Sequence, residues 1–258
     1  MGGMRIAVFG GTGNAGARIV AQVQRHGHEV VAVSRSGSDV HGAPGAKADL
    51  LSGDGLHAAL DDVDVLVDAT NTANPLDTRI FTLGAQHLIA AAEHVGVERA
   101  VVLSIVGAEH STFPYHQRKA DQERRYLSSR LDASVVRATQ FHDFPITFFE
   151  QARPLGVIPV FLGARFQTVD PDEVAELVAQ EAVEPSGKRF TEIGGPRVRV
   201  SRDLAKAWQQ ATHARGLIVN GPFPPSLLTF FREGRNLLGE GGQVGSVSFE
   251  DWLSRTMR

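Results

Sequence analysis

A glycine-rich turn near the start of the chain, set between a predicted strand and a predicted helix, constrains the fold more than any other feature. The apolar run at residues 6–9 predicts a short buried strand. Three glycines follow it at intervals of three: Gly10, Gly13 and Gly16. We expect a helix to open at Asn14 or Ala15 and to end at His26. A second strand at 29–34 completes a strand–turn–helix–strand unit within about 30 residues.

Each of the three glycines has a reason to be there if the turn binds a dinucleotide. Gly10 permits a sharp turn off the strand, and Gly16 lets the helix pack closely against it. Gly13 has no Cβ, so the backbone there can approach a diphosphate. The free N–H groups and the partial positive charge at a helix N-terminus suit an anionic pyrophosphate. The alternative is a turn with a purely structural role, but the surrounding strands and helix favour dinucleotide binding.

The end of the second strand indicates which dinucleotide is preferred. At this position an Asp or Glu normally holds the ribose hydroxyls of NAD. This chain has Ser34, Arg35 and Ser36 instead. A guanidinium and neighbouring hydroxyls suit a 2′-phosphate, which predicts NADP(H) rather than NAD(H). An arginine in a solvated loop is the alternative interpretation of Arg35.

The rest of the first half alternates strands and helices. We expect strands at 46–50, 64–69, 99–104 and 133–137, and helices at 52–60, 77–95 and 115–129. This order predicts an α/β fold with a doubly wound parallel sheet. The polar residues Thr70 and Asn71 follow the strand at 64–69, at the carboxyl edge where ligands bind in such sheets.

The second half of the chain is less regular. Prolines at 145, 154 and 159 break it into short pieces. We expect a strand at 189–193 and helices at 171–182, 201–214, 226–237 and 249–255, with Ser201 as the cap of its helix. The interpretation is one domain over 1–258, with a dinucleotide-binding core at 1–140 and a small, irregular, mostly substrate-binding region at 141–258.

Composition excludes several classes of protein. The 258 residues include no cysteine, which rules out disulfides and thiolate chemistry. The net charge of −3 argues against nucleic acid or an anionic membrane as the main partner. We expect a cytoplasmic protein, since no apolar run reaches about 20 residues and little chain precedes the first strand. The histidines and carboxylates show no spacing typical of a metal site, so no metal is predicted.

Tyr115 and Lys119 form the candidate catalytic pair. They are four residues apart, so a helix places them on one face. A nearby ammonium stabilises a phenolate and lowers the pKa of a tyrosine, which can then exchange a proton with a carbonyl or alcohol oxygen. Ser104, at the end of the strand at 99–104, is a candidate to hold the same oxygen. A surface pair on a solvated helix is the alternative.

Together these features resemble an atypical short-chain dehydrogenase/reductase, and more closely its NmrA-like, NAD(P)H-binding branch. The matching segments are residues 10–16, 34–35, 48–50, 104–107 and 137–141, Tyr115 with Lys119, and, further on, 169–175, 192–196, 231–237 and 249–253. The resemblance therefore covers nearly the whole chain, and it implies a Rossmann fold.

The resemblance also implies the outline of the cofactor site. The residues that it assigns to NADP(H) are Gly10, Thr12, Gly13, Asn14, Ala15, Gly16, Ser34, Arg35, Asp49, Leu50, Ala69, Thr70, Asn71, Lys119, Thr139 and Phe141. Among these, it implies that Asp49 lies near the adenine and that Thr139 and Phe141 lie near the nicotinamide.

Two functions remain open, with a third as a weaker option. The first is an NADP(H)-dependent oxidoreductase that moves hydride to or from a small carbonyl, quinone or alcohol, working as a monomer or homodimer. The second is a regulatory protein that senses NADP(H) without turnover, as the resemblance implies for members that lack the tyrosine. Because Tyr115 and Lys119 are both present, the enzyme is favoured. A sugar-nucleotide epimerase is the third option.

Overall fold

The computed structural model describes residues 3–72 and 74–257, so Ala73, in the polar loop expected after residues 64–69, lies outside the described residues. The chain divides into two compact units. Unit 1 comprises Met1–Ser104, Gln117–Arg137 and Pro171–Thr191, and unit 2 comprises Ile105–His116, Ala138–Asp170 and Glu192–Arg258. Residues 171–191, which the sequence placed in the C-terminal region, thus belong to unit 1 together with the glycine-rich turn.

An eight-stranded sheet dominates the fold and has the order β12-β9-β6-β5-β4-β1-β2-β3. Its strands are β1 (Arg5–Phe9), β2 (Glu29–Ser34), β3 (Gly45–Lys47), β4 (Val65–Asp68), β5 (Arg99–Ile105), β6 (Asp132–Ala138), β9 (Phe190–Gly194) and β12 (Gln243–Val244). β1 pairs in parallel with both β2 and β4, and β2–β3 and β4–β5 are parallel too. The predicted doubly wound parallel sheet is confirmed.

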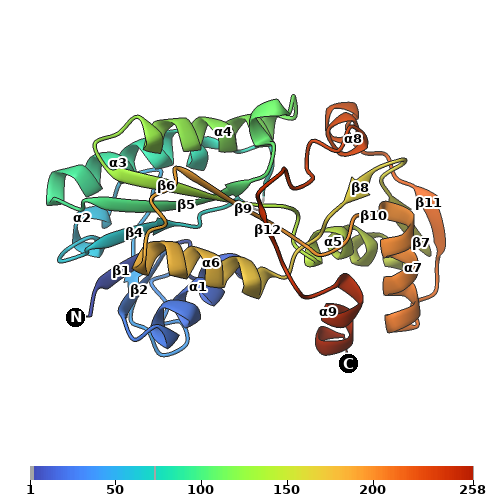
Figure 1. Cartoon of the computed structure of the whole chain (residues 1–258), viewed down its shortest axis with the longest axis horizontal. Coiled ribbons are helices and arrows are strands. Elements are labelled where there is room, and N and C mark those ends of the chain that lie inside the picture. The colour runs from blue at the N-terminus through green and yellow to red at the C-terminus, as the bar shows by residue number, and fades with distance from the viewer. Residues whose placement is uncertain (1–2, 73, 258) are drawn as a thin grey trace. The chain divides into compact units, whose positions relative to one another are not determined.

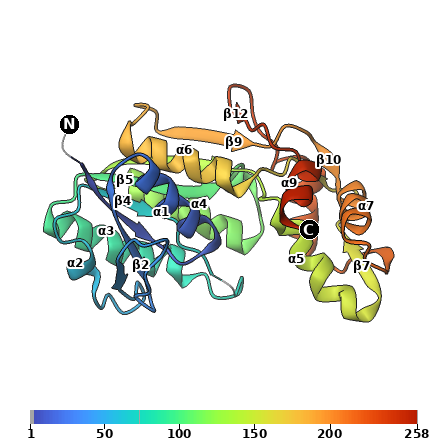
Figure 2. The same cartoon turned by 90° about the horizontal axis from the view of Figure 1, so that it is seen from below.

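Helices cover both faces of the sheet in unit 1. The elements are α1 (Asn14–Arg25), α2 (Leu56–Ala59), the 3-10 helix η1 (Arg79–Phe81), α3 (Leu83–Val95), α4 (Pro114–Leu127), whose first residues belong to unit 2, and α6 (Pro171–Val183). α1 packs with α6 on one face, while α2, α3 and α4 cover the other (Figures 1 and 2). Side chains on alternate residues of the buried strands, such as Ala7 and Phe9, join the core under α3.

Unit 2 is built around aromatic side chains rather than a large sheet. Its elements are the 3-10 helices η2 (Ala108–His110) and η3 (Arg153–Leu155), α5 (Asp143–Ala152), α7 (Ser201–Thr212), α8 (Pro225–Arg232), α9 (Phe249–Thr256), and the strand pairs β7 (Val157–Val160) with β11 (Leu217–Asn220) and β8 (Arg165–Phe166) with β10 (Arg199–Val200). The buried aromatic core includes Phe149, Phe161, Phe166, Trp208, Phe230 and Phe231. Burial of this much aromatic surface stabilises a unit with few ladder hydrogen bonds.

Two helices predicted in the first half are wrong in extent. The helix expected at 52–60 is reduced to α2, because Gly53 and Gly55 have positive φ angles of 84° and 77° and hold the chain in turns. The helix expected at 77–95 begins only at Leu83. Before it, the Asp77 carboxylate accepts a hydrogen bond from the backbone of Arg79, and a separate 3-10 turn follows. A local side-chain bond of this kind competes with a regular helix.

Three expectations for the second half are also wrong. The helix expected at 226–237 is α8, which ends at Arg232, two residues before Gly234 with its positive φ of 70°. Ser201 is not a cap: Val200 holds that position, and the Ser201 hydroxyl accepts a hydrogen bond from the Phe161 amide at 3.0 Å. The helix α5 forms where the prolines predicted broken chain. Pro145 lies in its first turn, where a missing N–H leaves no helical hydrogen bond unmade.

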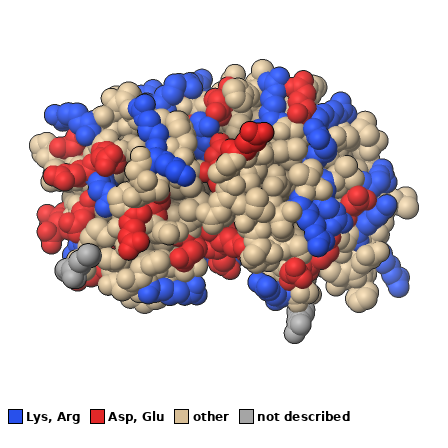
Figure 3. All heavy atoms as spheres, in the orientation of Figure 1, with Lys and Arg blue, Asp and Glu red and all other residues tan. Residues whose placement is uncertain are grey.

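The surface mixes charges of both signs. On the face drawn in Figure 3, acidic and basic side chains are interspersed rather than gathered into one block. Within the described ranges, no helix combines the length and the apolar character needed to cross a bilayer.

Candidate functional site

Among the three glycines spaced three apart after β1, two occupy positions that are too tight for any other residue. Gly10 has a φ of 78°, and a Cβ there would lie 2.8 Å from the Ala69 carbonyl oxygen. A Cβ on Gly16 would lie 2.0 Å from the Gly10 carbonyl oxygen, which no packing adjustment accommodates. The roles assigned to Gly10 and Gly16 are therefore confirmed: the first makes the turn, and the second brings α1 against it.

The tip of the turn is open to solvent. Thr12, Gly13 and Asn14 are exposed, and Ala15 is half-buried. Gly13 is the N-cap of α1, so the first turn of the helix has no side-chain cap within the described part of the chain. Uncapped N–H groups at an exposed helix N-terminus, reached by a close backbone turn, fit an anionic diphosphate.

The other predicted cofactor residues of unit 1 follow the carboxyl ends of neighbouring strands. Phe9 is in register with Val33 of β2 and with Asp68 of β4, so Gly10, Ser34 and Ala69 emerge at one edge of the sheet. Arg35 is exposed, and none of the ion pairs formed by the described residues includes it. The Ser34 hydroxyl accepts a hydrogen bond from the Gly37 amide at 3.1 Å, which shapes the loop beside Arg35.

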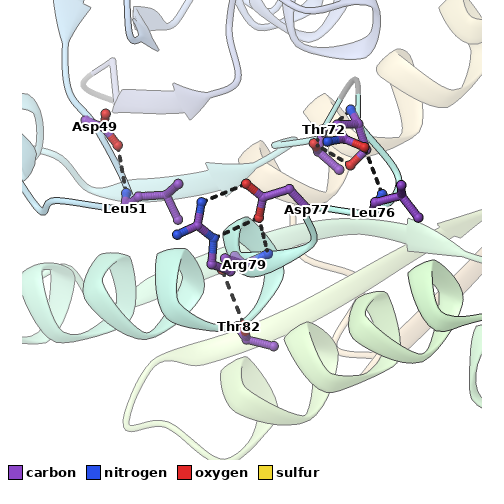
Figure 4. Close-up of polar contacts among 8 residues, drawn as sticks. Asp49, Leu51, Thr72, Leu76, Asp77, Arg79 and Thr82 are labelled. Atoms are coloured by element: carbon purple, nitrogen blue, oxygen red, sulfur yellow. Dashed lines mark hydrogen bonds and ion pairs between the residues drawn. The ribbon is translucent and has the colours of Figure 1, made fainter.

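Further predicted contacts of unit 1 follow β3 and β4, and Figure 4 shows polar contacts of Asp49 and of the segment from Thr72 to Thr82. The Asp49 carboxylate accepts a hydrogen bond from the Leu51 amide at 2.8 Å, and the Leu50 carbonyl oxygen lies 2.9 Å from a ring nitrogen of His87. After β4, the side-chain oxygen of the exposed Asn71 accepts a hydrogen bond from the Thr72 amide at 2.7 Å. An exposed Asp77–Arg79 ion pair closes this segment, and hydrogen bonds from Arg79 lower the pKa of Asp77 to about 2.

Lys119 is not a surface residue. Its side chain is buried in unit 1, where Nζ donates to the Leu103 carbonyl at 2.7 Å and to Gln122 Oε1 at 2.5 Å. The ammonium also lies 4.9 Å from the centre of the Phe81 ring. Burial lowers the pKa of Lys119 to about 8, although Asp68 and Glu123 oppose the change. The interpretation of Lys119 as part of a solvated pair is thereby excluded.

Ser104, one residue beyond Leu103, is also buried. Its hydroxyl has no hydrogen-bond partner among the described residues, and its exposed fraction is 3%. An unpaired buried hydroxyl costs free energy, so a ligand that supplied a hydrogen-bond partner would recover that cost. Lys119 and Ser104 thus bring a cation and an unused hydroxyl to the end of β5.

Three of the predicted site residues belong to unit 2. Tyr115 is half-buried in the first turn of α4, with its ring centre 6.4 Å from that of Phe113 and 5.9 Å from that of His116. Burial lowers the pKa of His116 to about 4, and its ring lies 2.9 Å from the Ser111 hydroxyl. The ring beside Tyr115 is therefore neutral at physiological pH.

Thr139 and Phe141 lie after β6 in unit 2. The Thr139 hydroxyl donates to the Gln167 carbonyl at 2.5 Å, and the residue is buried. Phe141 is half-buried and pairs with Val169 in an isolated β-bridge. The Thr139 hydroxyl is thus committed to its own unit, and the contact predicted between these residues and the nicotinamide stays a prediction.

Sequence reasoning missed a buried polar network centred on Asp68. The carboxylate, fully buried at the end of β4, accepts hydrogen bonds from Thr70, Gln122 and Tyr126. Two signals could have revealed it. Asp68 is an acid in an otherwise apolar strand, and Lys119, Gln122 and Tyr126 recur at the spacing of one helix face.

Comparison with known proteins identifies the class to which this fold and site belong. Residues 10–185 match the family described as NAD(P)H-binding, which is well over half of the chain. The chain therefore belongs to the NAD(P)H-binding family, in agreement with its resemblance to NmrA-like short-chain dehydrogenase/reductases.

Individual relatives are more distant. Photosystem II assembly factor Ycf39 from Synechocystis sp. is 30% identical over 153 residues, which cover 54% of this chain but only 45% of that protein. An NADPH-dependent quinone oxidoreductase from Escherichia coli superposes with a TM-score of 0.76 and 15% identity, covering 98% of this chain and 100% of that one. An epimerase from Methanothermobacter thermautotrophicus gives 0.81 and 17%, covering 99% and 91%. At these identities the two structures establish the fold.

Proposed function

We propose that the protein is an NADP(H)-dependent oxidoreductase that acts on a small carbonyl, quinone or alcohol, in the cytoplasm, as a monomer or homodimer. The observation that carries the proposal is the glycine turn. Cβ atoms are excluded at Gly10 and Gly16, and the helix N-terminus beyond Gly13 is exposed and uncapped among the described residues. Such a cradle suits the pyrophosphate of a dinucleotide.

The preference for NADP(H) over NAD(H) rests on Arg35. It is exposed at the end of β2, no described ion pair holds it, and the loop from Ser34 to Ser36 carries no carboxylate. A guanidinium there would bind a 2′-phosphate through charge-assisted hydrogen bonds.

Three side chains would serve the reaction. The bound nucleotide supplies or accepts the hydride. Tyr115 would give a proton to the substrate oxygen or take one from it, and Ser104 would donate its unused hydroxyl hydrogen. Lys119 would contribute the positive charge that favours a phenolate. The quinone oxidoreductase with the same fold supports a quinone as one substrate class.

The experiment replaces Tyr115 by phenylalanine, after a panel of quinones, aldehydes and ketones has been screened with NADPH. We expect turnover to fall by about 100-fold or more, because a general acid is lost, while NADPH affinity and fold are kept. Tyr126→Phe is the matched variant, since Tyr126 is the other tyrosine of the chain and lies in the same helix. It should cost about 1 kcal/mol of stability and less than tenfold in turnover. Equal turnover by wild type and Tyr115→Phe would remove Tyr115 from the mechanism.

A second function is a nucleotide-sensing regulatory role without turnover. The relative from Synechocystis supports it, because its name describes an assembly factor rather than an enzyme. If the whole panel is inert while NADP⁺ and NADPH bind and change the affinity for a protein partner, this second function replaces the first.

A further inference from the structure

We infer that Asp68 and Gln122 are positioning residues that fix the direction of the hydrogen bonds on Lys119 and so hold its ammonium, in the charged form, against the Leu103 carbonyl. The inference concerns unit 1 alone. It deepens the proposed function, on which its catalytic meaning rests, by naming the groups that prepare Lys119.

The Asp68 carboxylate is saturated by donors. Oδ1 accepts the Thr70 amide at 3.0 Å and the Thr70 hydroxyl at 2.6 Å. Oδ2 accepts Gln122 Nε2 and the Tyr126 hydroxyl, both at 2.8 Å. Asp68 has no exposed surface, and these four hydrogen bonds replace those that its carboxylate would make with water. The two hydrogen bonds to Oδ1 also fix the position of Thr70, in the segment that follows β4.

The direction of the Gln122 amide follows from the charge on Asp68. A carboxylate can only accept hydrogen bonds, so Gln122 has to turn its NH₂ group toward Asp68. Its other end, Oε1, is then an acceptor, and it lies 2.5 Å from Lys119 Nζ. Gln122 is itself fully buried, so no water competes for either end. The charge of Asp68 thus fixes the direction of the Gln122 amide dipole, whose negative end faces Lys119.

Lys119 depends on that dipole because no carboxylate among the described residues is bonded to it directly. The charged and titratable groups near it are Asp68 from β4 and Glu123 and Tyr126 from α4. The Glu123 carboxylate is bound by Arg137 of β6 at 2.6 Å, so most of its charge is compensated. Since burial lowers the pKa of Lys119 to about 8, a modest change in its acceptors moves the group between charged and neutral near physiological pH.

The test is the pKa of Lys119, measured by NMR on protein labelled with ¹³C-lysine, without nucleotide or substrate. The chain has four lysines, and Lys47, Lys188 and Lys206 are exposed, so Lys119 is the buried signal. In Asp68→Asn, the introduced amide donates where the carboxylate accepted. Gln122 then reverses, and its NH₂ group faces the ammonium. We expect the pKa of Lys119 to fall by about one unit or more.

A double variant, Asp68→Asn with Gln122→Glu, is the matched rescue. The introduced amide donates to the introduced carboxylate, which also accepts from Lys119, so an acceptor again faces the ammonium and the net charge is restored. We expect the pKa of Lys119 to return to the wild-type value or above it. Tyr126→Phe removes the other donor to Oδ2 without reversing Gln122, and should shift the pKa of Lys119 by less than about 0.3 unit.

Two results would overturn the inference: an unchanged pKa of Lys119 in folded Asp68→Asn, or a double variant that falls as far as the single one. If Asp68→Asn does not fold, Gln122→Met removes the acceptor from Lys119 while leaving Asp68 three donors, and it must lower the same pKa. The NMR measurement needs no turnover, so a failure of the proposed enzyme activity leaves this test intact. Where a substrate is found, the apparent pKa in the pH–rate profile of Asp68→Asn should shift in the same direction as the pKa of Lys119.

Discussion

The interiors of the two units hold polar groups in different ways. Unit 1 buries charges, with Asp68, Lys119 and the Glu123–Arg137 pair close to the carboxyl ends of its strands, and it balances each with several hydrogen bonds. Unit 2 buries an aromatic core, and burial keeps His116 neutral beside the Phe230 ring. The difference shows that unit 1 stabilises buried charges through hydrogen bonds, whereas unit 2 depends mainly on apolar packing.

Truncating the aromatic core should give the largest effect. Phe149 is fully buried, with its ring centre 5.4 Å from that of Trp208. Phe149→Ala should cost about 3–5 kcal/mol, through lost burial and the cavity left behind. Both tryptophans, Trp208 and Trp252, belong to unit 2, so tryptophan fluorescence during urea unfolding follows this unit. Phe148→Ala, at a half-buried site, should cost clearly less, and equal losses would contradict the packing described.

Crowding the glycine turn should have the next largest effect, and it acts on unit 1. Gly16→Ala should destabilise the protein by about 3 kcal/mol or more, because the new Cβ collides with the Gly10 backbone. Gly13→Ala is the matched variant: its Cβ would lie 3.1 Å from the Gly10 carbonyl oxygen, a tight contact that a small shift relieves, so it should destabilise the protein clearly less than Gly16→Ala. Its effect should appear in calorimetry as weaker NADPH binding. Equal destabilisation by the two variants would show that the turn is looser than described.

Acid should destabilise unit 2 through His116. Its pKa is lowered by burial from 6.5 to about 4, so below pH 6.5 the unfolded chain takes up a proton that the folded chain does not. The contribution of His116 to the free energy of unfolding is fully present above pH 6.5, and it should decline by about 3 kcal/mol as the pH falls to 4. His116→Gln should flatten this decline in urea titrations. His110→Gln, at an exposed position six residues earlier in the chain, should leave the decline in place.

The same contrast explains how much the sequence could predict. In unit 1 the strands are continuous apolar runs, so the doubly wound sheet followed from local pattern. The turn followed from local pattern too, because Gly10 and Gly16 cannot carry a side chain. In unit 2 the two short strand pairs join segments distant in sequence, such as Val157 with Leu217, and no local pattern announces them. The helix α5 was missed because Pro145 was taken as a breaker, although a first helical turn tolerates it.

The candidate site divides along the same line. Arg35 and the turn residues could be placed from their distance to the first strand. The burial of Lys119 could not, because it depends on Asp68, which is 51 positions earlier in the chain and reaches Lys119 only through Gln122. The lone acid in the strand and the polar helix face are visible in the sequence, but neither of them indicates that the two are joined by hydrogen bonds.

Removing the Arg35 guanidinium should have the smallest of these effects, confined to one ligand. A charge-assisted contact to a 2′-phosphate contributes about 1.5–3 kcal/mol, or roughly tenfold to a hundredfold in affinity. Arg35→Ala should lose most of that for NADPH and leave NADH binding nearly unchanged. Arg79→Ala, at an exposed arginine already paired with Asp77, serves as the control. A loss of NADH binding as large as that of NADPH would assign Arg35 to the common part of the nucleotide.

Calorimetric titration of the wild-type protein with NADPH and with NADH tests the proposed nucleotide site most directly. We predict one nucleotide bound per chain, and NADPH bound at least about tenfold more tightly than NADH. Absence of binding by both nucleotides to the folded protein would contradict the assignment of the glycine turn. Equal affinity, or tighter binding of NADH, would contradict the assignment of Arg35.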